Sequence, residues 1–261
     1  MKINKKKSSS GFRYRGLKGD RFETLTDTIF GFSITLLVIS SEVPKTYIQL
    51  QASMYSFIGF IFCALLLFSI WHDHKTYFLR YGLQNKRTNL LNFILLFVLL
   101  FYIYPMKYLF SYLGTAIYVN IKLYFGDSSK GIQLAVNELK KANLNLEQWS
   151  DIMLRFGFGL FLIYLIFLLL HINALIKKKE LKLNVLETFI TKTSIQEYAI
   201  LLSITVLSII FVLGLGSTSF IYWSLSYLMI PIVLPIHQTF RKNRYKAILK
   251  LQKEINEFKG N

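Results

Sequence analysis

Acidic residues and cysteine are both scarce in this sequence. Only 14 of its 261 residues are Asp or Glu, and its single cysteine, Cys63, lies within an apolar stretch. One cysteine cannot form an intramolecular disulfide, and it does not make a Cys-rich metal motif. No Ser/His/Asp or Cys/His set of the kind that nucleophilic catalysis needs can be assembled with any specificity. We therefore do not expect an enzyme.

Charge of either sign is also rare. Charged residues make up 17% of the chain, whereas about 25% is usual in soluble domains. Hydrophobic residues reach 53% and gather in long blocks, which indicates an all-α integral membrane protein. The formal net charge of +17 would also suit a nucleic-acid-binding protein, but most basic residues lie in polar segments between the apolar blocks. We expect membrane lipids and no nucleic acid as partners.

Six segments are long and apolar enough, or nearly so, to cross the hydrocarbon core, which takes about 20 residues. They lie at approximately 22–41, 52–71, 90–110, 152–175, 198–215 and 219–237. We therefore predict six transmembrane helices per subunit within residues 20–240.

Polar segments flank and interrupt this six-helix domain. Residues 1–19 and 241–261 are basic and are predicted to be cytoplasmic tails, the first of them disordered and able to touch anionic headgroups. Residues 113–150 form the longest polar segment between spans, with a turn near Gly126 followed by a helix, and are expected to form a small cap on the outer side.

The distribution of Lys and Arg predicts the orientation. With the N-terminus inside, the inner segments hold 24 of these residues and the outer segments hold five, apart from Lys107 and Arg155 near outer helix ends. Because cytoplasmic flanks are enriched in Lys and Arg, we expect a multi-pass protein of the cell membrane with both termini in the cytoplasm.

The first predicted helix combines ionisable residues with an ordered apolar face. At about 100° per residue, Phe32, Thr35, Leu36 and Ile39 lie on one side of the helix, and Asp27 lies about 140° away from Phe32. This face could line a narrow pore while Asp27 points into the bundle and anchors the helix. The spacing alone favours an ordinary amphipathic face packed against other helices, because such faces are common.

Asp27 needs a partner, because an unpaired carboxylate at membrane depth is unfavourable. Several polar side chains are predicted at the same inner depth, which favours one polar network around Asp27. The candidates are Trp71, His72 and His74 at the end of the second helix, and Asn89 and Asn92 at the start of the third.

All four histidines fall toward inner helix ends, which raises the question of a metal site. They are His72, His74, His171 and His237. No Cys or carboxylate accompanies them at ligand spacing, and metal sites usually show a denser cluster. We interpret them as structural residues and expect no metal and no cofactor.

The first helix resembles the signature of the transmembrane protein 175 family, potassium-permeable channels of lysosomes and bacteria. That signature is an arginine, three residues, then Phe-Ser-Asp, and a following run like Ile-Thr-Leu-Leu-Val. Here it reads Arg21, three residues, Leu25-Thr26-Asp27, and then Ile34 to Val38. Downstream, Trp71 followed by His74, and Asn89-Leu-Leu-Asn92 followed by Pro105, are similar to the family as well.

The resemblance implies a homotetramer with its pore on the axis of four copies of the first helix. Apolar residues five, nine and twelve positions after the aspartate would narrow the pore, and these are Phe32, Leu36 and Ile39, with the Thr35 hydroxyl beside them. The expected function is a modestly selective channel for potassium ions. A signature network would pack the helices: Arg21, Thr26, Asp27, Trp71, His74, Asn89 and Asn92.

Two other functions are considered beside the channel. A secondary transporter would be expected to show inverted repeats, broken helices and a polar site at mid-membrane, none of which is evident apart from Pro231 and Pro235 in the last helix. A membrane scaffold or regulatory subunit would assemble without ion flux.

Overall fold

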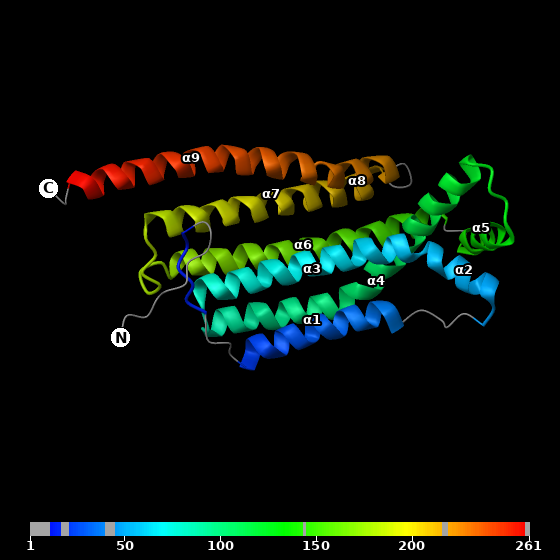
Figure 1. The fold of residues 1–261 in the computed structure, drawn as a ribbon, viewed down its shortest axis with the longest axis horizontal. Helices are drawn as coiled ribbons and strands as arrows, with labels where there is room; N and C mark the ends of the chain where they lie inside the picture. Colours follow the sequence, from blue (N-terminus) through cyan, green and yellow to red (C-terminus); the bar gives the residue numbers. More distant parts are fainter. Residues whose placement is uncertain (1–10, 17–20, 40–44, 143–144, 216–218, 259–261) are drawn as a thin grey trace.

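A computed structural model describes residues 11–16, 21–39, 45–142, 145–215 and 219–258, although a few side chains in these ranges, including that of Ile39, are not described. The described chain is almost entirely helical, as predicted, and its long helices run antiparallel along one bundle axis (Figure 1). The helices are α1 (Arg21–Ile39), α2 (Tyr47–Tyr55), α3 (Phe57–Tyr81), α4 (Lys86–Tyr124), α5 (Lys130–Ala142), α6 (Leu146–Ile176), α7 (Val185–Leu215), α8 (Ser219–Leu228) and α9 (Ile230–Phe258).

Four of these helices are long and apolar enough to cross a membrane. They are α3, α4, α6 and α7, and they correspond to the second to fifth predicted segments. The first predicted segment forms α1, and the sixth is divided between α8 and α9. Over the described residues, neither α1 nor the α8–α9 pair has the same combination of length and apolarity.

Two predicted helices are interrupted. The second segment was expected to be continuous from residue 52, but α2 ends at Tyr55 and α3 begins at Phe57. The last segment breaks at Met229, so that Pro231 falls in the first turn of α9. A proline is tolerated in a first helical turn because its missing N–H has no partner there. From this point α9 continues to Phe258, so residues 241–258, expected as part of a tail, extend the helix.

Residues 11–16 also depart from the prediction of a disordered tail. Phe12 is fully buried, and the backbone N–H groups of Arg15 and Gly16 donate to the carbonyl of Leu79 near the end of α3. A Cβ atom on Gly16 would collide with the backbone carbonyl of Phe78, so this segment lies directly against α3. Residues 1–10 and 17–20 lie outside the described residues.

The core depends on close backbone contact between α3 and α4. A Cβ on Gly59 would overlap the carbonyl of Phe110, and one on Gly114 would overlap the backbone of Gly59. These glycines let the two helices approach more closely than any larger residue would allow. The ring of Tyr102 on α4 fills the space beside Gly159 on α6 in the same way.

At the opposite end of the bundle from residues 11–16, α5 packs on α2 and α4 (Figure 1). The predicted turn is present at Gly126, whose φ is 78°. The 113–150 segment therefore consists of the end of α4, this turn, α5 and the start of α6.

Candidate pore helix and its polar anchor

One face of α1 is completely buried against α3 and α4. Thr26, Phe30, Ser33 and Leu37 recur at intervals of four, three and four residues, and each is at most 2% exposed. This is the spacing of a single helix face. Because it mixes hydroxyl and apolar side chains, the face can combine packing with hydrogen bonds to the neighbouring helices.

A chain of buried polar groups joins α1 to α4 and α3 at this face. The Nδ2 group of Asn92 donates to the hydroxyl of Thr26 at 3.0 Å, and that hydroxyl donates to the Phe22 carbonyl at 2.8 Å. The Oδ1 atom of Asn92 lies 2.8 Å from Nε2 of His74. Since a carbonyl oxygen can only accept, the imidazole donates through Nε2.

Asp27 makes the second link between α1 and α3. Its Oδ1 atom accepts a hydrogen bond of 2.9 Å from the indole Nε1 of Trp71. Asp27 was predicted to point into the bundle, but its side chain is exposed on the single chain. It lines a groove of about 280 Å³ between α1 and α3, whose walls include Gly31 and Phe68.

The side of α1 opposite the anchor is uncovered in the single chain. Leu25 is 50% exposed and Phe32 is 55% exposed. Thr28, which lies between them, and Thr35, which follows Phe32, are exposed as well. These residues recur at intervals of three, four and three, the spacing by which helices pack around a common axis. The Thr35 hydroxyl donates to the Gly31 carbonyl, so its oxygen can still accept from, or coordinate, a passing group.

The structure separates the predicted site residues into three groups. Phe32 and Thr35 lie on the open face, Leu36 is half-buried at its edge, and the side chain of Ile39 lies outside the described residues. Thr26, Asp27, Trp71, His74 and Asn92 lie in the anchor. Arg21 is exposed at the first position of α1. Among the described residues, no hydrogen bond joins Asn89 to the anchor.

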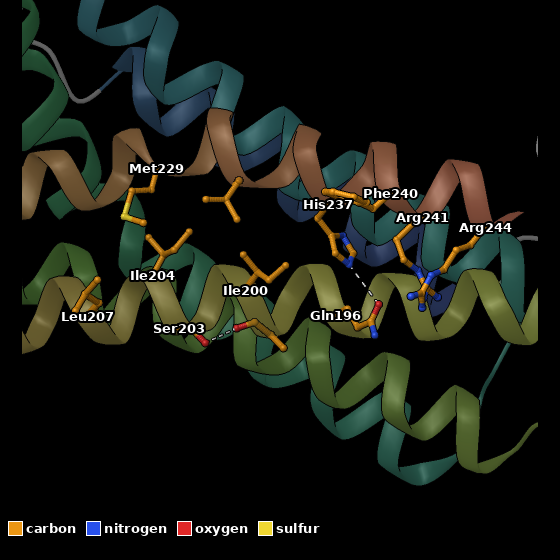
Figure 2. A pocket seen from close by; sticks show the side chains of 12 residues that line it. Gln196, Ile200, Ser203, Ile204, Leu207, Met229, His237, Phe240, Arg241 and Arg244 are labelled. Carbon is orange, nitrogen blue, oxygen red and sulfur yellow. Dashed lines mark hydrogen bonds between the residues drawn. The ribbon is translucent and has the colours of Figure 1, made fainter.

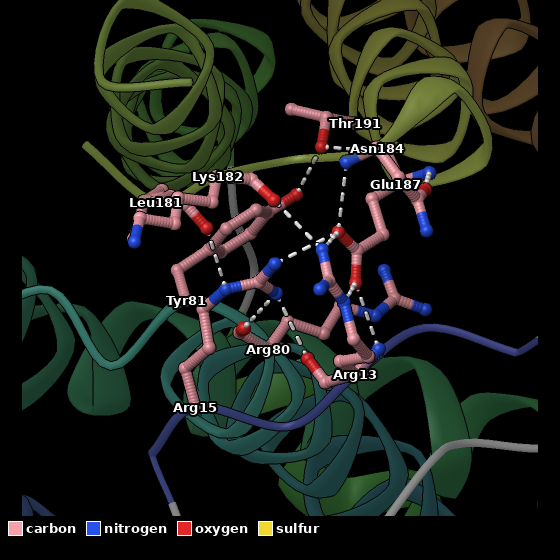
Figure 3. Close-up of polar contacts among 9 residues, drawn as sticks. All are labelled: Arg13, Arg15, Arg80, Tyr81, Leu181, Lys182, Asn184, Glu187 and Thr191. Atoms are coloured by element: carbon pink, nitrogen blue, oxygen red, sulfur yellow. Dashed lines mark hydrogen bonds and ion pairs between the residues drawn. The ribbon is translucent and has the colours of Figure 1, made fainter. Parts of the chain in front are cut away.

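A charged cluster at the same end of the bundle is absent from the sequence-based prediction. Glu187 is fully buried, and its Oε2 atom lies 2.7 Å from a guanidinium nitrogen of both Arg13 and Arg15 (Figure 3). The Nε group of Arg13 donates to Oε1 at 2.9 Å, and the hydrogen bond to Glu187 raises the pKa of Arg13 above its ordinary value. These contacts fasten residues 11–16 to α7.

The local sequence around Glu187 explains why it occupies this position. The Asn184 side chain accepts from the Glu187 backbone N–H at 2.7 Å, and the Glu187 carboxylate accepts from the Asn184 backbone N–H at 3.0 Å. This reciprocal capping box starts α7 and is recognisable in the sequence as an Asn followed three residues later by Glu. The two arginines that complete the cluster lie more than 170 residues away in the chain, so local patterns could not predict them.

The antiparallel bundle with four membrane-length helices defines the class of this protein: a multi-pass helical membrane protein. A family model described as "Endosomal/lysosomal potassium channel TMEM175" matches residues 21–102, from α1 into α4. A Marivirga tractuosa protein named "Potassium channel" is 40% identical over 238 residues, or 89% of this chain and 92% of that protein.

A solved structure agrees over nearly the whole chain. The crystal structure of the potassium channel MtTMEM175, a variant in complex with a nanobody–MBP fusion protein, is 34% identical with a TM-score of 0.75. The match covers 91% of this chain and 100% of that one. The chain therefore belongs to the TMEM175 family, and the resemblance seen in the sequence is confirmed.

Proposed function

We propose that this protein is a modestly selective, potassium-permeable channel whose pore is lined by α1 from four identical subunits. The observation that carries the proposal is the division of α1 into two faces. One face is buried and hydrogen-bonded to α3 and α4, while the opposite face exposes Phe32 and Thr35. A helix held this firmly, with an uncovered face of regular spacing, is suited to meet copies of itself at a symmetry axis.

The relatives support the same function. The Marivirga tractuosa protein and the crystallised MtTMEM175 both carry the name potassium channel, and the similarity to each spans about nine-tenths of this chain. The family match includes all of α1 and α3 and the first part of α4, which carries Asn92.

The proposed constriction consists of rings of Phe32, Leu36 and Ile39, with Thr35 hydroxyls between the apolar rings. A ring of bulky apolar side chains closes a narrow pore by expelling water from it. A potassium ion loses its water more readily than the smaller sodium ion, so passage through such a narrow region favours potassium. Hydroxyl groups alone replace hydration incompletely, and for that reason we expect modest selectivity.

Each subunit is proposed to cross the cell membrane six times, with α1 as the first crossing and the α8–α9 pair as the last. In the tetramer α1 is surrounded by protein, so it does not need the apolarity of a lipid-facing span. The excess of Lys and Arg in the segments that join helices at the end of the bundle near residues 11–16 supports placing that end in the cytoplasm.

The proposal is tested by purifying the protein, measuring its mass by native mass spectrometry, and reconstituting it in liposomes loaded with potassium or sodium. We expect a tetramer and an ion efflux without valinomycin that is several-fold faster for potassium than for sodium. A verified tetramer that passes neither ion would contradict the channel and favour the scaffold.

A further inference from the structure

A groove of about 740 Å³ lies between α7 and α9, apart from the candidate pore helix (Figure 2). Among the described helices, α1 contacts α3 and α4, whereas α9 contacts α7 and α8. If α1 faces the axis of an assembly, the groove lies on a flank of the subunit that is separated from the axis by the rest of the bundle.

The groove has an apolar part and a basic end. Ile200, Ile204, Leu207, Met229 and Val233 line the apolar part, and His237, Arg241 and Arg244 follow on α9 at the other end (Figure 2). From Met229 to Arg244 the helix advances about 22 Å at roughly 1.5 Å per residue. One leaflet of the hydrocarbon core is about 15 Å thick, so the groove can hold an extended acyl chain beneath a headgroup.

The basic end is arranged to receive an anion. The Nε group of Arg241 donates to the Thr193 hydroxyl at 2.9 Å, and its guanidinium lies 3.9 Å from the centre of the Phe189 ring. These contacts hold the guanidinium in place, and a guanidinium has five N–H donors. Arg244 is exposed one turn further along α9. Within the described part of the chain, no acid forms an ion pair with either arginine.

His237 adds an unsatisfied group at the boundary between the two parts. Its Nε2 atom lies 3.3 Å from Oε1 of Gln196, while its Nδ1 atom is buried without a hydrogen-bond partner among the described residues. A buried polar atom without a partner costs free energy unless a ligand or water supplies one. The acid Glu197 lies close enough to act on Arg241, and Gln238 bonds to its carboxylate, but among the described residues it forms no ion pair with either arginine.

We propose that this groove binds one anionic phospholipid, with an acyl chain along α7 and its phosphate between Arg241 and Arg244. The match of an apolar channel to a basic end, which follows directly after the last predicted span (residues 219–237), carries the assignment. A second copy of this chain fits less well, because a twofold contact through the same surface would bring the arginines toward their symmetry mates.

Native mass spectrometry of the purified protein in detergent tests the proposal by titration with phosphatidylglycerol and with phosphatidylcholine of the same acyl chains. We expect phosphatidylglycerol to bind about tenfold more tightly or better. Replacing both arginines (R241Q with R244Q) removes this preference, whereas K246Q with K250Q, an equal loss of charge on exposed α9 residues outside the groove, changes it by less than about twofold.

Two further variants keep the test decisive. R244Q alone changes an exposed side chain and leaves the Arg241 contacts intact, and it is expected to reduce the preference by several-fold. S203W fills the apolar part of the groove without changing charge, and is expected to weaken the binding of both lipids. Equal binding of the two lipids by the unaltered protein would overturn the proposal, as would equal losses in both double variants.

Two other outcomes would replace the lipid with a different occupant. If glycerol phosphate without acyl chains displaced phosphatidylglycerol at equal concentration, the site would bind a free anion. If R241Q with R244Q dissociated the oligomer, the groove would be a contact between subunits. Because lipid binding is read from mass, each result is independent of whether the protein conducts ions.

Discussion

The amide of Asn92 on α4 donates a hydrogen bond of 3.0 Å to the hydroxyl of Thr26 on α1, and neither side chain is exposed. His74 on α3 bonds to the same Asn92 side chain. A shift of α1 along its axis would leave these buried groups unsatisfied, whereas apolar contacts alone would tolerate it. The anchor therefore fixes the axial position and rotation of α1, and with them the direction in which Phe32 points.

Replacing Thr26 with Val tests this anchor with little change in shape. The variant leaves the Asn92 amide without its acceptor, which costs about 1–3 kcal/mol in the free energy of unfolding. Thermal unfolding in detergent, followed by tryptophan fluorescence, measures the loss. Thr28→Val is the matched control, because the Thr28 hydroxyl is exposed and bonds only within its own helix. Equal effects of the two substitutions would argue against the anchor.

Asp27 is expected to act as a hydrogen-bond acceptor for Trp71. Asp27→Asn keeps an acceptor oxygen, so it should leave most of the proposed tetramer intact. Asp27→Ala removes the acceptor and should lower stability by about 1 kcal/mol and reduce the tetramer yield. Size-exclusion chromatography with light scattering compares the two. A loss of tetramer in Asp27→Asn as large as in Asp27→Ala would show that the negative charge matters more than the hydrogen bond.

Sequence patterns predicted the helical class and the positions of α1, α3, α4, α6 and α7. Five of the seven residues that the family resemblance placed in one network meet in the anchor, and Arg21 and Asn89 are not joined to it by the hydrogen bonds described above. Hydropathy identifies α3, α4, α6 and α7 because each must satisfy the same requirement for an apolar span. The breaks at Ser56 and Met229 were missed, since neither is marked by a pattern that distinguishes a break from a kink. The direction of the Asp27 side chain was predicted wrongly. Helical periodicity gives the angle between two side chains on α1, but it does not give which neighbouring helix lies on each side of α1.

The fastening of residues 11–16 could not be predicted, because it depends on contacts between distant segments. A basic N-terminal segment with a serine run is typical of a disordered tail. Only the fold brings Arg13 and Arg15 to the buried Glu187 and places Phe12 in the core.

Glu187→Gln tests this fastening. The variant removes the charge that holds two guanidinium groups, and we expect a loss of about 1.5–3 kcal/mol in stability. We also expect trypsin to cleave after Arg13 and Arg15 far faster than in the unaltered protein. Glu180→Gln is the control, because its ion pair with Lys177 at 2.6 Å is exposed and is worth about 0–1 kcal/mol. Unchanged cleavage in Glu187→Gln would mean that Phe12 alone holds the segment.

The close approach of α3 and α4 predicts that Gly59 tolerates no side chain. Gly59→Leu would drive the helices apart against the Phe110 backbone, at a cost of about 1–3 kcal/mol or more. Gly214→Ala serves as the control, because a Cβ there meets nothing within 4 Å and alanine favours a helix by up to about 1 kcal/mol. In thermal unfolding, the melting temperature should fall in Gly59→Leu and rise in Gly214→Ala. A Gly59→Leu protein as stable as the unaltered protein would contradict the close packing of α3 and α4.

The central claim is that the open face of α1 lines the pore and that Phe32 narrows it. Its most direct test is the potassium conductance of single channels in planar bilayers for the unaltered protein, Phe32→Ala and Phe158→Ala. Phe158 is 56% exposed on α6, similar to the 55% of Phe32, and α6 does not contact α1 among the described residues. We predict a conductance that rises several-fold in Phe32→Ala and stays unchanged in Phe158→Ala. Equal conductance in all three proteins would contradict the account.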